Sequence, residues 1–185
     1  LQSAAIGDRV LIQSRDGAAG GEVLRLAPRL CFVLPDSSGD GMTIGDRVEL
    51  LGRADIAPDD SWIGRIVDPT GQPLDGKPLL RGAVSRGLRA AAPAAASRRR
   101  LGERLSTGVA VFDTLLPLVR GQRIGLFAGS GVGKSSLLGR FARGVTADVV
   151  VIALVGERGR ELREFTERVL GPSGMARSVV VTATS

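Results

Sequence analysis

Residues 128–135 of this 185-residue chain have the sequence Ala128-Gly129-Ser130-Gly131-Val132-Gly133-Lys134-Ser135. The pattern matches the phosphate-binding P-loop, with alanine in place of the first glycine. Glycine lets backbone N–H groups converge on phosphate oxygens that side chains would otherwise obstruct. We expect Lys134 to reach the β- and γ-phosphates of a nucleotide and the hydroxyl of Ser135 to coordinate Mg²⁺. The expected nucleotide-binding residues are Ala128, Gly129, Ser130, Gly131, Val132, Gly133, Lys134, Ser135 and Ser136.

The segments on either side of this turn alternate between strand and helix patterns. Residues 123–128 are a short apolar run that predicts a strand, and residues 135–144 carry apolar residues at helical spacing. Residues 149–155 are continuously apolar, which is typical of a strand buried on both faces. A helix is expected over 159–170 and a further strand over 178–182. This order predicts a parallel sheet with right-handed crossovers.

A second polar run, Gly156-Glu157-Arg158-Gly159-Arg160-Glu161, follows the apolar strand directly. Ligands of parallel α/β sheets bind beyond the C-terminal ends of the strands, which places Glu157 on the same edge as the P-loop. A carboxylate there can orient or deprotonate a water molecule that attacks the γ-phosphate, and Arg158 can meet phosphate charge. Spacing alone equally allows Glu157 to be a helix-start residue with solvated arginines beside it.

The first 80 residues have the pattern of short strands separated by turns. Strands at this regular spacing predict a small β-barrel or sandwich. The candidate strands are 10–12, 22–26, 30–34, 48–51 and 62–67.

Residues 81–100 change in character to an alanine- and arginine-rich stretch of low complexity. Pro93 opposes a continuous helix there. We interpret the stretch as a linker with solvated arginines. A nucleic-acid-binding arm is the alternative, but the stretch has no aromatic residue for base stacking. The expected domain limits are therefore 1–80 for the barrel, 81–100 for the linker and 101–185 for the nucleotide-binding domain.

Composition narrows the class of protein. The chain is 43% hydrophobic and has a net charge of +6, one cysteine and no histidine. This composition is globular, and it excludes a disulfide-built scaffold and histidine-based catalysis. No apolar run approaches the length that spans a bilayer. Because the chain lacks an initiating methionine and stops directly after a strand-like run, we expect it to be a fragment.

Several runs together resemble the rotary ATPase superfamily, and within it the type III export ATPases, particularly the flagellum-specific ATPase. The resemblance covers nearly the whole chain and is most specific from residue 62 onward. The runs that carry it are 64–68, 71–76, 105–109, 112–113, 120–123, 127–136 and 152–161.

The resemblance implies an N-terminal β-barrel joined to a RecA-like P-loop domain of α/β class, whose parallel sheet is incomplete in this chain. It implies ATP hydrolysis with Mg²⁺ in support of flagellar protein export, with Lys134, Glu157 and Arg158 as catalytic residues. The implied partners are ATP, further copies of the chain in a hexameric ring, export-apparatus proteins, and export substrates or chaperones; no nucleic acid is implied. The implied location is the cytoplasm, peripheral to an inner-membrane export gate.

Departures from the family pattern limit what this chain is expected to do. Members carry a later strand that ends in an Mg²⁺-binding aspartate, an arginine from the neighbouring subunit and a C-terminal helical domain, none of which is in this sequence. We therefore expect the chain to bind nucleotide but to turn over little or none. The alternatives are a virulence injectisome ATPase, a RecA-like RNA helicase or termination factor, and a ring subunit that binds nucleotide without hydrolysis.

Overall fold

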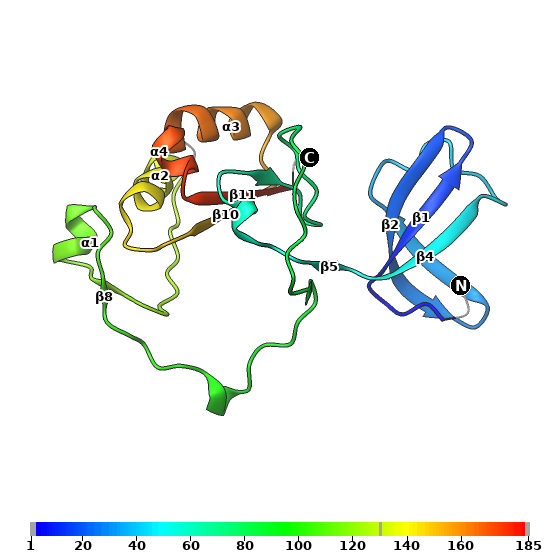
Figure 1. The fold of residues 1–185 in the computed structure, drawn as a ribbon, viewed down its shortest axis with the longest axis horizontal. Coiled ribbons are helices and arrows are strands. Elements are labelled where there is room, and N and C mark those ends of the chain that lie inside the picture. Colours follow the sequence, from blue (N-terminus) through cyan, green and yellow to red (C-terminus); the bar gives the residue numbers. More distant parts are fainter. Residues whose placement is uncertain (1–2, 130, 184–185) are drawn as a thin grey trace. The chain divides into compact units, whose positions relative to one another are not determined.

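The structure is a computed structural model that describes residues 3–129 and 131–183 (Figure 1). The chain forms two compact units. The first contains Leu1–Ala57 and Val84–Ala91, and the second contains Pro58–Ala83 and Ala92–Ser185. Among the described residues, no helix is long and apolar enough to cross a membrane.

The first unit is built on a four-stranded antiparallel sheet of barrel-like strands. Its order is β3-β2-β1-β4, and the described strands do not close into a barrel. Alternating burial places Val10, Ile12 and Val23 in its core. The expected strands at 10–12, 22–26, 30–34 and 48–51 are therefore confirmed, each within a longer element. The bounds are β1 Asp8–Ser14, β2 Gly17–Ala27, β3 Leu30–Pro35 and β4 Arg47–Arg53, with a separate pair β5 Asp55–Ile56 and β7 Arg86–Gly87.

The second unit has a parallel sheet of order β10-β11-β6, covered on one face by helices (Figure 1). Its core combines sheet and helix residues, namely Ala142, Ile152, Leu154, Phe165, Leu170 and Val180. The principal elements are β6 Ile66–Val67, α2 Lys134–Gly144, β10 Val150–Val155, α3 Gly159–Glu164, the π-helical η3 Phe165–Leu170, α4 Gly171–Met175 and β11 Ser178–Ala183. The smaller elements are η1 Asp60–Trp62, η2 Ala95–Ser97, β8 Arg104–Leu105, α1 Ala110–Thr114 and β9 Leu118–Val119.

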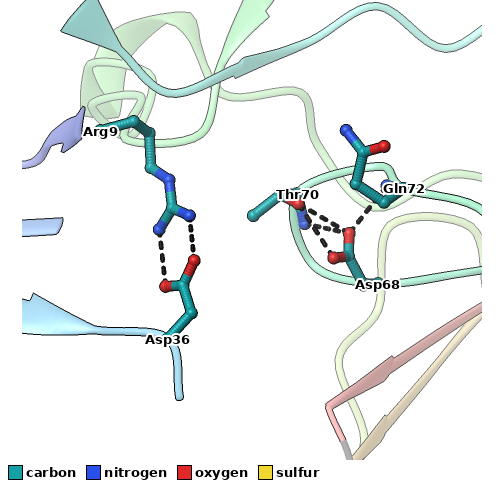
Figure 2. Close-up of polar contacts among 5 residues, drawn as sticks. All are labelled: Arg9, Asp36, Asp68, Thr70 and Gln72. Atoms are coloured by element: carbon teal, nitrogen blue, oxygen red, sulfur yellow. Dashed lines mark hydrogen bonds and ion pairs between the residues drawn. The ribbon is translucent and has the colours of Figure 1, made fainter. Parts of the chain in front are cut away.

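Each unit also holds a polar cluster of its own (Figure 2). In the first unit, Arg9 on β1 makes a two-point ion pair with Asp36, which follows β3. In the second unit, the Asp68 carboxylate accepts hydrogen bonds from the backbone N–H groups of Thr70 and Gln72, both at 2.8 Å. The ion pair in the first unit links β1 to the end of β3. The hydrogen bonds to Asp68 stabilise the turn that follows β6.

The strand expected over 62–67 belongs to a different sheet from the one we predicted. Only Ile66–Val67 is a strand, and it pairs in parallel with β11 rather than with the N-terminal strands. Val67 and Val180 are fully buried in the second unit. Burial of apolar side chains against β11 therefore decides the position of this short segment, and a sequence pattern carries no such pairing information.

The prediction of a strand over 123–128 is also wrong, because these residues form no β-ladder with any described strand. Ile124, Leu126 and Phe127 are exposed. A strand is stabilised by its neighbours, so an apolar run without a hydrogen-bonded partner stays irregular.

The expectation that the strand over 149–155 is buried on both faces is wrong as well. Ile152 and Leu154 are buried against the helices, whereas Val151 and Val155 on the other face are 68% and 77% exposed. The described helices cover only one face of the sheet, so the continuous apolar run is half-buried.

Candidate nucleotide-binding site

A cavity of about 590 Å³ lies in the second unit, between the P-loop and the segment that follows β10. One wall comes from described residues of the P-loop and the start of α2, and the other from Leu154, Glu157 and residues of α3 and η3. The lining residues are Ala128, Gly129, Gly131, Gly133, Lys134, Ser135, Ser136, Leu154, Glu157, Glu161, Glu164, Phe165 and Val169. The two polar runs that lie far apart in the sequence therefore face one another across this cavity.

The P-loop wall has the backbone geometry of an anion cradle. Gly131 and Gly133 have φ values of 76° and 102°, which side-chain-bearing residues rarely adopt, and a Cβ at either would meet nothing within 4 Å. The 11-residue helix α2 begins at Lys134, and no side chain caps its first turn. Its free N–H groups and the positive end of its dipole lie beside Lys134 and Ser135, where phosphate charge is stabilised.

The opposite wall is acidic. Glu157 follows β10, and Glu161 and Glu164 lie on α3 at positions four and seven residues further on, so all three line the cavity. A hydrogen bond with Glu161 is the main cause that raises the pKa of Glu157. Burial and the negative charge of Glu161 act in the same direction, and the positive charge of Lys134 opposes them. Glu157 therefore interacts with Glu161 on its own wall and with Lys134 on the opposite wall.

Most of the residues expected at the site line this cavity. They are Ala128, Gly129, Gly131, Gly133, Lys134, Ser135, Ser136 and Glu157. Val132 is exposed and is not among the lining residues. The Arg158 side chain is 71% exposed, contacts Glu161 at 3.9 Å and does not line the cavity either. Ser130 lies outside the described residues. The chemical roles assigned to all of these residues remain predictions.

Sequence reasoning missed Glu161 and Glu164 as site residues. The signal was present, because Glu161 and Glu164 are three residues apart within the helix expected over 159–170 and therefore share one of its faces. Phe165 and Val169 carried no comparable signal, since apolar residues at helical spacing usually indicate a core. Both contribute to the core cluster and to the cavity wall.

The donor set fits a nucleotide that carries Mg²⁺. Within residues 3–129 and 131–183, no group of three or more acidic, cysteine or histidine side chains is arranged to hold a metal ion alone. Mg²⁺ is usually held by one or two protein oxygens together with phosphate oxygens and water. Ser135 and the carboxylates opposite it are oxygen donors of that kind, beside a cradle suited to phosphate.

The chain is similar to known proteins over nearly its whole length. Residues 108–185 match the family described as the ATP synthase alpha/beta family, nucleotide-binding domain. The chain is 46% identical over 181 residues to a flagellum-specific ATP synthase of Agrobacterium fabrum, an alignment that covers 97% of this chain and 38% of that protein. It is 42% identical to a type 3 secretion system ATPase of Xanthomonas euvesicatoria, over 98% of this chain and 42% of that protein.

A solved structure shows the same fold. The assembled ATPase EscN, in complex with its central stalk EscO from the type III secretion system of enteropathogenic E. coli, matches with a TM-score of 0.87 and 35% identity. The match covers 98% of this chain and 45% of that one. The chain thus spans less than half the length of the proteins that it resembles.

Proposed function

We propose that this chain is the ATP-binding part of a type III export ATPase, because residues 108–185 match the ATP synthase alpha/beta family. The observation that carries the proposal is the cavity in which the P-loop faces Glu157. Relatives named flagellum-specific ATP synthases favour flagellar export. The similarity to a type 3 secretion system ATPase keeps the injectisome as the second candidate.

Each wall of the cavity has a separate task in this proposal. The N-terminus of α2 and the Lys134 ammonium would hold the β- and γ-phosphates, and the Ser135 hydroxyl, with the carboxylates opposite, would hold Mg²⁺. When bound, Mg²⁺ would neutralise the charge of the terminal phosphates. Glu157 accepts a hydrogen bond from the water that attacks the γ-phosphate, and Arg158 turns toward phosphate charge when nucleotide binds.

In this proposal, ATP hydrolysis requires a protein as long as these relatives. The present chain spans less than half of that length. We propose that the longer protein forms a homo-hexameric ring in the cytoplasm, beneath an inner-membrane export gate, and acts with export-apparatus proteins, chaperones and substrates. The similar EscN structure is that of an assembled ATPase with its central stalk, and this assembly supports a ring. The domain limits 1–80, 81–100 and 101–185 are part of the same proposal.

Equilibrium binding of a fluorescent ATP analogue in the presence of Mg²⁺ tests the proposal. Lys134→Ala should weaken binding at least about tenfold, because it removes a charge-assisted contact with phosphate. The only other lysine of the chain, the exposed Lys77, offers a matched control. Lys77→Ala removes the same charge away from the cavity and should leave the affinity unchanged. A folded chain that binds no nucleotide, or that loses affinity equally in both variants, would contradict the proposal.

A further inference from the structure

One face of α2 packs closely against the helical segment that follows Glu157. Gly139, Ala142 and Arg143 lie on this face, at the three- and four-residue spacing of neighbours on a helix. Gly139 and Ala142 are buried there, and Val169 and Leu170 of η3 lie opposite. Small residues at a helix contact allow two backbones to approach more closely than large ones do.

Gly139 is the closest point of this contact. A Cβ at this position would lie 2.5 Å from Val169 Cγ1 and 2.9 Å from the Val169 carbonyl oxygen. The second distance involves backbone, so a change of side-chain rotamer cannot relieve it. Glycine inside a helix is unfavourable on propensity alone. The close approach to Val169 therefore explains why this position requires glycine.

Arg143 adds a polar connection at the same place. Its guanidinium donates a hydrogen bond to the carbonyl oxygen of Val169. Val169 lies in the π-helical turn Phe165–Leu170, and Pro172, just beyond it, has no N–H to offer to the preceding turn. π-Helical turns are rare and occur frequently at functional sites. Here the irregular turn is held by a side chain that comes from the P-loop helix.

Both helices also form walls of the cavity. α2 begins at Lys134 in one wall, and the segment that carries Glu157, Glu161 and Val169 forms the other. Because the two meet at Gly139 and Arg143, this contact sets their separation. The α- and β-phosphates would be held by the P-loop backbone itself, whereas the terminal phosphate would lie between the two walls.

We propose that Gly139 and Arg143 are positioning residues that set the distance between the P-loop and the acidic wall, and hence the preference for a nucleotide with a γ-phosphate. This inference rests on the proposed nucleotide-binding function. Neither residue contacts the nucleotide in this proposal. They act through Val169 and the segment that bears Glu157.

The test compares the affinities of the chain for AMP-PNP and for ADP, both with Mg²⁺, by calorimetry. Gly139→Ala and Arg143→Met should weaken AMP-PNP binding by about tenfold, since a wall displaced by part of an ångström loses contacts with the terminal phosphate. ADP affinity should change less than about twofold, since the P-loop backbone is intact. Arg143→Lys retains a donor and should restore most of the preference. Arg140→Met is the matched control, because Arg140 is exposed on the same helix.

The outcomes separate the two proposals. Wild-type preference for AMP-PNP in folded Gly139→Ala and Arg143→Met chains would overturn this inference and leave the proposed function intact. Equal weakening of both nucleotides would also overturn it, because a general loss of structure affects both ligands. A wild-type chain that binds neither nucleotide would overturn the proposed function, and this inference with it.

Discussion

At the scale of single residues, the main feature of the site is the carboxyl pair of Glu157 and Glu161. The hydrogen bond between them requires that the pair retain a proton, which is why the pKa of Glu157 is raised. Lys134 acts against this shift from the opposite wall. The protonation of Glu157 thus depends on its neighbours on both sides of the cavity, and a nearby phosphate would change it further.

Replacement of Glu161 by glutamine should return the pKa of Glu157 toward its ordinary range. The substitution removes the negative charge and the carboxyl partner that favour the protonated form. A raised pKa in the folded state means that the wild-type pair stabilises the fold at low pH, and that this stability is lost as the pH rises through the range of Glu157. ¹³C NMR titration of the Glu157 carboxyl measures the shift.

The control for that titration is Glu167→Gln. Glu167 lies in the same helical segment but is exposed, and its carboxylate contacts Arg163 at 3.6 Å. This variant should leave the Glu157 titration unchanged. A Glu157 pKa that is the same in wild-type and Glu161→Gln chains would show that the hydrogen-bonded pair does not form in solution.

At the scale of elements, β6 and the turn that follows it are held by the ion pair of Arg65 and Asp75. Two hydrogen bonds of 2.6 Å join the guanidinium to the carboxylate, and the side chains are only 13% and 19% exposed. Arg65 also donates to the carbonyl oxygens of Lys77 and Pro78. The contact with Arg65 lowers the pKa of Asp75 to about 2. One arginine therefore organises the loop beside the parallel sheet.

Asp75→Asn should lower the free energy of unfolding of the second unit by about 2 kcal/mol at pH 7, the value that corresponds to the lowered pKa. The wild-type contribution is present above the ordinary value of 3.8 and is lost as the pH falls through the range down to about 2. Urea denaturation at pH 7 and pH 3 should therefore show a smaller difference between the two proteins at pH 3.

Asp148→Asn is the matched control for this prediction, because Asp148 is an exposed aspartate of the same unit. It should change the stability little at either pH. A difference between Asp75→Asn and wild type that does not shrink on acidification would mean that charge is not the basis of the effect.

At the scale of the whole molecule, the chain consists of two units, and only the second contains the candidate nucleotide site. A ligand stabilises the cooperative unit whose native state binds it. The strands β1 to β4 have their own core of Val10, Ile12 and Val23. Nucleotide binding should therefore act unequally along the chain.

Saturation with MgATP at about 100 times its dissociation constant should stabilise the second unit by about 2.7 kcal/mol. Hydrogen exchange should slow at the backbone amides of α2, β10 and β11 and stay unchanged at those of β1 to β4. Lys134→Ala with the same nucleotide provides the control. Equal slowing in both units would show that they unfold as one body.

The sequence by itself was sufficient for features that depend on local chemistry. The glycines of the P-loop predict its backbone, and the apolar spacing after Lys134 predicts α2, which forms over Lys134–Gly144. The regularly spaced strands β1 to β4 of the first unit and the apolar strands β10 and β11 of the parallel sheet were also predictable. Each signal lies within a few residues of the element that it specifies, so a linear pattern contains it.

Tertiary structure decided everything that depends on which segments meet. Residues 123–128 have an apolar strand pattern but no partner strand among the described residues, and Ile66–Val67 pairs with β11, which lies far away in the sequence. The contact of Gly139 with Val169 likewise joins distant parts of the sequence. Strand pairing and close packing are set by burial and hydrogen bonding between remote segments. A local pattern can state what a segment is able to form, but only its neighbours in space determine what it does form.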